Sequence, residues 1–269
     1  MNFNNKTVLI TGGASGIGKI MGRKSLERGA AKLIIWDINE KGLADTKAEF
    51  DMLAGEIITY KVDVSNSEEI INTAQAVKDK IGTIDVLINN AGIVVGKYFH
   101  EHTHLDISRM MAINADAIMH TTRAFLPEMM QRNIGSVCNI CSSAGLISNP
   151  KMSVYAASKW AAIGWSDSLR LEMKQLGKRI YITTIMPFYI NTGMFDGVKS
   201  SILPILEPEP TAERIMKAIE HKTKMLAMPL PYWFIRLNQG LLPIRIFEWI
   251  MQHIFGIYDG MKEFKGRQS

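Results

Sequence analysis

Short apolar runs alternate with longer amphipathic stretches along most of this chain. Runs rich in β-branched residues predict strands, and stretches whose apolar residues recur every three or four positions predict helices. The predicted strands are Lys6–Thr11, Lys32–Asp37, Ile57–Val62, Ile84–Asn89, Ser136–Cys141, Ile180–Met186 and Lys224–Met228. The predicted helices are Gly16–Arg28, Glu40–Leu53, Ser67–Lys80, about Leu105 to Arg132, Ser153–Leu176 and Thr211–Lys222. This alternation is typical of the α/β class, in which helices wind a parallel sheet.

The pattern changes at Pro229. Residues 1–228 contain no repeat, low-complexity segment or linker, so they predict one domain. Residues 229–269 form an apolar extension interrupted by prolines, in which Ile244–Phe255 has the spacing of a short amphipathic helix.

Composition and charge narrow the functional class. The chain has 269 residues, of which 47% are hydrophobic and 21% charged, and its formal charge is +5. This balance is ordinary for a globular protein, and the mild positive charge favours anionic ligands or surfaces. The basic residues form no block and are not interleaved with aromatic residues, so nucleic-acid binding is not expected. No stretch has the features of a signal peptide or a membrane span, which predicts a cytoplasmic protein.

A glycine-rich turn follows the first predicted strand. Gly12, Gly16 and Gly18 lie where this strand passes into the next helix. Glycines let the backbone approach a pyrophosphate, and the helix N-terminus offers free N–H groups and a partial positive charge. A tight turn without a ligand is the alternative. The strand before it, the helix after it and an acidic residue about twenty positions further on favour a dinucleotide site.

That acidic residue is Asp37, which ends the second predicted strand. A carboxylate there accepts hydrogen bonds from both ribose hydroxyls of NAD and repels the 2′-phosphate of NADP. Capping of the following helix is the alternative role. We therefore expect NAD as the cofactor, with NADP less favoured.

Further motifs follow in a fixed order. They are Asn89-Asn90-Ala91-Gly92 after the fourth strand, Asn114 in the long helix, Ser142 after the fifth strand, and Tyr155 with Lys159 on the next helix. Together with the glycine turn, this set resembles the short-chain dehydrogenase/reductase family, in its single-domain branch, from residue 6 to about 230. The resemblance implies an NAD(P)-dependent oxidoreductase with a doubly wound, seven-stranded Rossmann sheet, assembled as a homodimer or homotetramer.

The resemblance also implies the cofactor contacts. Asp63 and Val64 are expected near the adenine, Asn89 to Gly92 along the cofactor, and Thr192 near the nicotinamide carboxamide. Ser15 stands where NADP-preferring relatives often carry a basic residue, which again favours NAD. The complete expected cofactor set is Gly12, Ser15, Gly16, Ile17, Gly18, Asp37, Asp63, Val64, Asn90, Ala91, Gly92, Tyr155, Lys159, Pro187, Ile190 and Thr192.

Tyr155 and Lys159 suit the proton transfer that accompanies hydride transfer. A free tyrosine is a poor base at neutral pH, because its pKa lies near 10. Lys159 is four residues further along the same helical face, and its ammonium, with the positive nicotinamide ring, should lower that pKa. Ser142 would donate a hydrogen bond to the substrate oxygen. Asn114 is expected to hold a water that relays protons from Lys159. If Tyr155 and Lys159 are considered without the other motifs, the alternative is that they form a pair on the surface of a helix with no catalytic role.

A narrower likeness appears downstream. Residues 191–195 (NTGMF), 206–209 (LEPE) and Leu242-Pro243 look like the retinol and 17-beta-hydroxysteroid dehydrogenase branch, whose members handle lipophilic alcohols. This likeness implies a lipophilic small-molecule substrate and a lid at about residues 188–210. Many such relatives begin with an apolar anchoring segment, which this sequence lacks. Phe188 stands where the family usually has glycine, and it should reshape the substrate pocket.

The extension and two smaller patterns remain open. Aromatic and basic residues at 232–258 suit peripheral contact with a membrane, and packing against the lid or a partner subunit is the alternative. Cys138 and Cys141 are spaced to point to opposite faces of a strand, so we expect two reduced thiols rather than a redox pair. The histidines at 100, 102 and 104 lack an evident carboxylate or cysteine partner, so no metal is expected.

Three other functions compete with the leading one. A 3-oxoacyl reductase of fatty-acid synthesis usually requires NADPH, which Asp37 disfavours. A non-catalytic dinucleotide-binding protein typically lacks the tyrosine or the lysine, and both are present. A peripheral membrane protein would use the extension as its main functional element.

Overall fold

A computed structural model describes residues 1–200, 202–229 and 231–266 of the protein. Seven parallel strands form the centre of this described part. Their order in the sheet is β3-β2-β1-β4-β5-β6-β7. They are β1 (Thr7–Thr11), β2 (Lys32–Asp37), β3 (Glu56–Lys61), β4 (Val86–Asn89), β5 (Gly135–Ile140), β6 (Ile180–Pro187) and β7 (Met225–Met228). The strand order reverses between β1 and β4, and ligands of such sheets bind at the carboxyl ends beside that point. The predicted doubly wound Rossmann sheet is confirmed.

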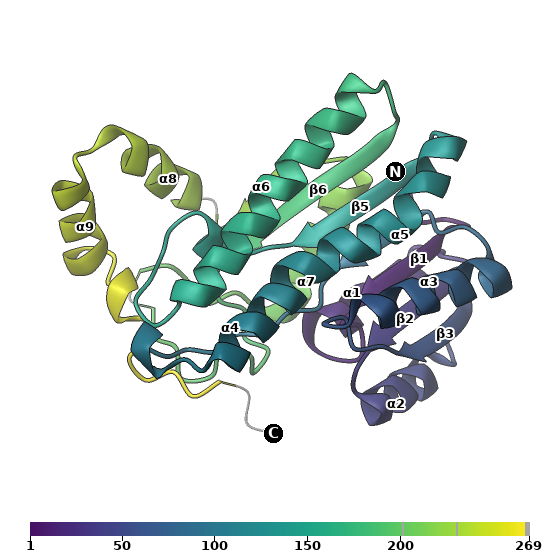
Figure 1. Ribbon diagram of the computed structural model, residues 1–269, viewed down its shortest axis with the longest axis horizontal. Coiled ribbons are helices and arrows are strands. Elements are labelled where there is room, and N and C mark those ends of the chain that lie inside the picture. Colours follow the sequence, from purple (N-terminus) through teal and green to yellow (C-terminus); the bar gives the residue numbers. More distant parts are fainter. Residues whose placement is uncertain (201, 230, 267–269) are drawn as a thin grey trace.

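Helices cover both faces of the sheet (Figure 1). They are α1 (Gly16–Glu27), α2 (Glu40–Phe50), α3 (Ser67–Ile81), α4 (His104–Met111), α5 (Ala117–Arg132), α6 (Ser153–Gln175), α7 (Pro208–Glu220), α8 (Pro231–Leu241) and α9 (Ile244–His253). Successive residues of β1 pack on opposite faces of the sheet, because successive side chains of a strand point in opposite directions. Val8 and Ile10 pack with α1, α2 and α7, whereas Leu9 packs with α3, α5 and α6.

The predicted long helix at about 105–132 is interrupted. A π-helical turn, Ala112–Asp116, separates α4 from α5. Such a turn adds one residue to the hydrogen-bonded ring, and it is often found at functional sites. It places Asn114, which is buried, against the loop that follows β4.

The extension after β7 differs from the prediction of a single short helix. It forms two helices, α8 and α9, which project beyond the sheet in Figure 1. The prolines of the extension predict interruptions of helical structure, but one of them, Pro231, is the first residue of α8, where no backbone N–H is needed. Ile235, Phe247 and Met251 from these helices are buried in one apolar cluster with Phe188 and Tyr189.

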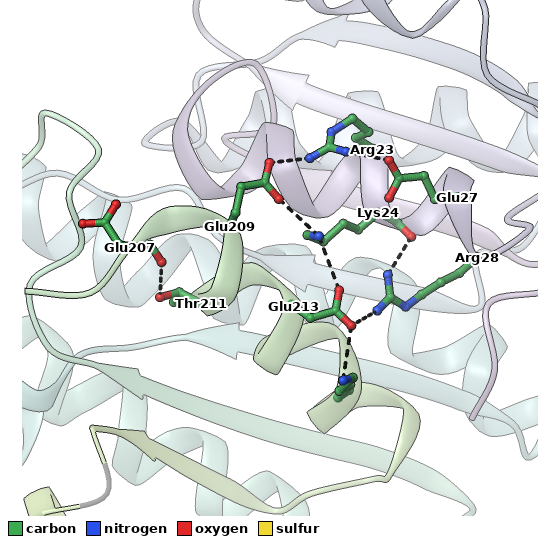
Figure 2. A network of polar contacts seen from close by, with 9 residues as sticks. Arg23, Lys24, Glu27, Arg28, Glu207, Glu209, Thr211 and Glu213 are labelled. Carbon is green, nitrogen blue, oxygen red and sulfur yellow. Dashed lines mark hydrogen bonds and ion pairs between the residues drawn. The ribbon is translucent and has the colours of Figure 1, made fainter.

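Ion pairs join α1 to α7 (Figure 2). Arg23 pairs with Glu209, and Lys24 lies 3.2 Å from Glu209 and 3.3 Å from Glu213. Arg28 donates to Glu213 at 2.7 Å. This network fixes the helix that follows the glycine turn against the helix that follows the expected lid.

The two cysteines lie on opposite sides of the sheet, as expected. Cys138 belongs to the cluster packed by α1 and α7, and Cys141 to the cluster around Tyr155. Both are buried free thiols, and burial raises the pKa of Cys141 to about 12. Neither is suited to be a reactive thiolate.

Candidate active site

The turn between β1 and α1 is shaped by its glycines. Gly12 and Gly16 have φ angles of +64° and +54°, which side-chain-bearing residues rarely adopt. A Cβ on Gly18 would lie 2.1 Å from the carbonyl oxygen of Gly12, so only glycine lets α1 approach the turn this closely. The first turn of α1 carries no acidic residue. Its N-terminal N–H groups therefore form a favourable place for a phosphate.

The residues after β4 support this turn from behind. The Asn90 side chain donates to the carbonyl oxygens of Thr11 at 3.1 Å and of Gly12 at 2.9 Å. The Thr11 hydroxyl accepts from the backbone N–H groups of Asn90 and Ala91 at 3.0 and 3.1 Å. Thr11 was not predicted, although it directly precedes the first glycine of the motif.

Asp37 lies at the other side of the turn. Its Oδ2 accepts from the backbone N–H of Ala14 at 3.0 Å, and its Oδ1 accepts from that of Asn39 at 3.0 Å. The cap of α2 is instead Asn39, whose side chain accepts from Gly42. The carboxylate thus joins the second strand to the glycine turn and faces the adjoining cavity.

A cavity of about 260 Å³ runs along the carboxyl ends of the central strands. Most predicted site residues line it together: Gly12, Ser15, Gly16, Ile17, Asp37, Asp63, Val64, Asn90, Ala91, Gly92, Ser142, Tyr155, Lys159, Pro187, Ile190 and Thr192. Gly18 and Asn114 lie behind this lining. Asn89 is not part of this lining, because its side chain lies in the core and donates to Thr122 and Asn139.

The cavity fits a dinucleotide. Two of its glycines have positive φ angles, and a helix N-terminus opens onto it. The Asp37 carboxylate belongs to its wall, where it could accept hydrogen bonds from a ribose. Gly92 adds room at the catalytic end, because a Cβ there would lie 3.2 Å from Asn114 Oδ1 and 3.6 Å from Lys159 Nζ.

Tyr155 and Lys159 lie one turn apart on α6 and are both buried. Lys159 Nζ is 5.8 Å from the centre of the Tyr155 ring and donates to the carbonyl oxygen of Ile140 at 3.0 Å. Ser142 is a hydrogen-bond partner of Tyr155, and its Oγ also accepts from the backbone N–H of Ala144 at 3.1 Å. Three polar groups therefore meet at one end of the cavity.

Burial dominates the protonation of this cluster. It raises the pKa of Tyr155 above its ordinary value, and the hydrogen bond with Ser142 offsets part of the rise. Burial lowers the pKa of Lys159, which the neighbouring Cys141 opposes. In the protein alone, burial therefore outweighs the lowering of the Tyr155 pKa that the sequence predicts. The predicted lowering of the Tyr155 pKa also depends on the positive nicotinamide ring. For the complex with the cofactor it therefore stays a prediction.

Asn114 is held by three hydrogen bonds. Its Oδ1 accepts from the backbone N–H of Ile93 at 2.9 Å, and its Nδ2 donates to the Ile93 carbonyl at 2.9 Å and to Ser158 Oγ at 3.1 Å. The π-helical turn thereby ties the loop after β4 to α6. The expected relay water stays a prediction.

Aromatic side chains close the catalytic end of the cavity. The Phe195 ring meets the Tyr155 ring edge-on at 6.1 Å between centroids, and Tyr189 lies 5.0 Å from Phe195 and 4.4 Å from Phe188. Phe188, Tyr189 and Phe195 fall within the lid expected from the sequence, but none of the three was among the expected site residues.

Other lining residues were not predicted. Arg109 and Ile113 reach the cavity from α4 and the π-helical turn. Ile113 directly precedes Asn114, so its position next to a predicted site residue was a usable signal. Arg109 had none, because its approach depends on how α4 packs.

The histidine-rich segment lies apart from this lining. The His100 ring stacks on Tyr98 at 6.1 Å, and the His102 side chain is fully buried beside Phe99. In the described part of the chain, no group of three or more His, Cys, Asp or Glu side chains is arranged to hold a metal ion.

The fold and the cavity are those of a dinucleotide-binding α/β protein, and comparison with known proteins identifies its family. The sequence matches the short chain dehydrogenase family over residues 6–202. It is similar to estradiol 17-beta-dehydrogenase 11 of Macaca fascicularis, with 34% identity over 96% of this chain and 86% of that protein. It is also similar to epidermal retinol dehydrogenase 2 of Homo sapiens, with 36% identity over 98% of this chain and 86% of that protein.

A solved structure agrees with these sequence relatives. A short-chain dehydrogenase/reductase from Burkholderia phymatum in complex with NAD superposes with a TM-score of 0.81 and 25% identity, over 89% of this chain and 95% of that chain. This chain therefore belongs to the short-chain dehydrogenase/reductase family, as the motif set predicted. It is an oxidoreductase that interconverts hydroxyl and carbonyl groups with a nicotinamide dinucleotide.

Proposed function

We propose that this enzyme oxidises a lipophilic alcohol, or reduces the matching carbonyl compound, with NAD as its cofactor and Tyr155 as its general acid/base. The observation that carries the substrate class is the apolar end of the cavity, where Ile93, Met194, Phe188 and Phe195 surround Tyr155. Such a lining suits a ligand with a large apolar surface. The named activities of the relatives, on estradiol and retinol, point to the same class.

The chain's own residues divide the chemistry among them. When bound, the dinucleotide supplies the acceptor or donor of the hydride. Tyr155 Oη takes the hydroxyl proton during oxidation and returns it during reduction, while Ser142 Oγ donates a hydrogen bond to the substrate oxygen. Lys159 would stabilise the phenolate by its charge and would hold the ribose of the dinucleotide. Asn114 fixes the loop at Ile93 and would hold the relay water.

The test of this role compares Tyr155→Phe with the intact protein on retinoids, steroids and medium-chain alcohols. Loss of a general acid/base should lower turnover by about 10² to 10⁴. Tyr181→Phe is the matched control, because that phenol lies at the start of β6 and contacts Lys222 rather than the cavity. Equal turnover by Tyr155→Phe and the intact protein on every substrate would remove the proposal.

Asp37 supports NAD over NADP. Its carboxylate is held by Ala14 and Asn39 at the cavity wall, where a 2′-phosphate would meet a second negative charge. Fluorescence titrations should show NADH binding at least about tenfold more tightly than NADPH, since one such charge clash costs over 1 kcal/mol. Tighter binding of NADPH would overturn this preference.

The lid and extension complete the proposal. We assign residues 1–228 to the dinucleotide-binding and catalytic domain, about 188–210 to its lid, and 229–269 to an extension that touches a membrane surface peripherally. Phe234, Leu237, Leu241, Ile244 and Trp249 are exposed on α8 and α9, and α8 carries no acidic residue. Aromatic and aliphatic side chains on such a face suit the bilayer interface. No helix in the described ranges is both long and apolar enough to cross a membrane.

Vesicle flotation tests the membrane contact. Leu237→Asn with Trp249→Asn should lose binding to anionic vesicles and keep the fold, because both side chains are exposed. Deletion of the extension is a poorer test, since Ile235, Phe247 and Met251 belong to the core. Equal flotation of both proteins would exclude this contact. A cytoplasmic homodimer or homotetramer is the expected assembly, which light scattering measures.

A further inference from the structure

The last described segment lies against both the expected lid and the loop that follows β4. Residues 260–266, called the strap here, are held to the lid by backbone and side-chain contacts. The backbone N–H of Lys265 donates to the Asp196 carbonyl at 2.8 Å, and that of Lys199 donates to the Gly260 carbonyl at 3.2 Å. Lys199 Nζ also pairs with Glu263 at 2.8 Å.

The strap also rests on the loop that follows β4. A Cβ on Gly96 would lie 2.3 Å from the Phe264 ring and 2.8 Å from the Met261 methyl group, so the ring is seated directly on this backbone. Phe264 and Met261 belong to the apolar cluster that contains Tyr155 and Tyr189. The strap therefore connects the expected lid with the loop that follows β4.

A second cavity of about 410 Å³ lies beside the strap. It is lined by residues 92–97, Met194 and residues 264–266. Gly92, Ile93 and Met194 line both this cavity and the catalytic cavity, so the two cavities adjoin at these residues. Ile93 and Met194 are therefore the residues that a long molecule would pass between Tyr155 and the outer cavity.

The charged groups of the outer cavity are both lysines. Lys97 and Lys265 line it beside Ile93, Val94, Val95 and Phe264, and its lining contains no carboxylate. Lys97 lies 3.3 Å from Asp106. Lys265 makes no side-chain ion pair within the described ranges, although the pKa of Glu263 is lowered by its pairing with Lys199 and, to a smaller extent, by the charge of Lys265. The lining of the outer cavity thus combines apolar walls with a net positive charge, which favours an anion.

We propose that the outer cavity binds the far, anionic end of a long lipophilic substrate. The class is an aliphatic chain with a hydroxyl or carbonyl group to be transformed at one end and a carboxylate at the other. Phe264 packs against the chain, and Lys265 with Lys97 meets the carboxylate. This inference rests on the proposed function, because the same substrate must reach Tyr155.

The test uses ω-hydroxydodecanoate and its methyl ester as matched substrates. They share the reacting end and the chain, and only the first carries a charge. The measured quantity is the preference, which is kcat/KM for the acid divided by kcat/KM for the ester. The intact enzyme should prefer the acid, and added salt should reduce the preference. Lys265→Ala should lower it about three- to fivefold, and Lys265→Glu about tenfold, as for a partly exposed charge contact.

The controls separate this subsite from the catalytic proposal. Lys262→Ala removes a lysine of the same strap that pairs with Asp259 at 2.9 Å and does not line the cavity, so the preference should stay unchanged. A fluorescent fatty acid should bind Lys265→Glu more weakly than the intact enzyme, and this binding assay does not depend on turnover. An intact enzyme that prefers the ester, or a preference that survives both Lys265 variants, overturns the subsite. Unchanged turnover of both substrates by Tyr155→Phe overturns the proposed function instead.

Discussion

Replacing Gly18 by alanine tests how the glycine turn is held. The added Cβ would lie 2.1 Å from the Gly12 carbonyl oxygen and 2.5 Å from Asn90 Nδ2, whereas ordinary contacts begin at 3.4 Å. The first pair must therefore separate by 1.3 Å, which is 3.4 minus 2.1. Because the nearest obstacle is backbone, α1 or the turn has to move.

The cost follows from what that movement breaks. Asn90 donates to the carbonyl oxygens of Thr11 and Gly12, and each lost hydrogen bond costs about 1 kcal/mol. Overpacking adds about 1–3 kcal/mol, and the better helix propensity of alanine returns about 1 kcal/mol. The free energy of unfolding should fall by about 2–4 kcal/mol. Movement of the helix N-terminus at the phosphate site should also weaken NADH binding.

Urea unfolding and NADH fluorescence titration measure the two effects. Gly164→Ala is the control, because Gly164 is exposed within α6 and its added Cβ would meet nothing within 4 Å. That variant should gain about 0.5–1 kcal/mol and keep its NADH affinity. Wild-type stability and NADH affinity in Gly18→Ala would refute the steric argument.

Three further predictions concern the catalytic lysine, the ion network and the pocket. Lys159→Met should lower turnover about 10²- to 10⁴-fold. Because burial lowers the Lys159 pKa, stability from this group is present above its unfolded pKa of about 10.4 and is lost as pH falls through the folded pKa. In urea unfolding, the free energy of unfolding of Lys159→Met minus that of the intact protein should therefore increase as the pH is lowered from 10.5 to 7. If this difference is constant over that range, the argument is contradicted. Glu213→Gln should cost about 0.5–1 kcal/mol at low salt and less at high salt, because Glu213 meets Lys24, Arg28 and Lys217. Glu40→Gln, which loses only one exposed pair with Lys61, should cost almost nothing by the same denaturation assay. Phe188→Ala should cost about 3–5 kcal/mol of stability and improve kcat/KM for bulkier ketones relative to smaller ones, since it empties volume beside Tyr155; an unchanged ratio contradicts a pocket role for this ring.

Much of the fold was predictable because strands buried on both faces are continuous apolar runs. Leu33 to Trp36 and Val86 to Ile88 are completely buried, and this is what their composition indicates. The glycine turn was predictable for a related reason, since Gly12 and Gly16 need conformations that other residues avoid.

The features that were missed depend on distant contacts. The π-helical turn at Ala112–Asp116 contains no helix-breaking residue, and its stabilising partners at Ile93 and Ser158 lie far away in sequence. Helix α8 was missed because Pro231 was treated as a breaker, although it begins the helix. The strap is irregular, and only its contacts with Asp196 and Gly96 reveal a role.

Chemistry and substrate choice are supported by different parts of this molecule. Tyr155 and Lys159 lie on α6 and Ser142 lies just after β5, and their positions depend on the sheet and on Asn114. The proposed lid is held elsewhere, by the bridge between Ile190 and Leu206, by the strap, and by the α1–α7 ion network at its end. Substitutions at Lys265 or Phe264 should therefore change which alcohol is accepted while the proton-transfer geometry at Tyr155 is kept. The fold thus allows substrate preference to change without rebuilding the catalytic cluster.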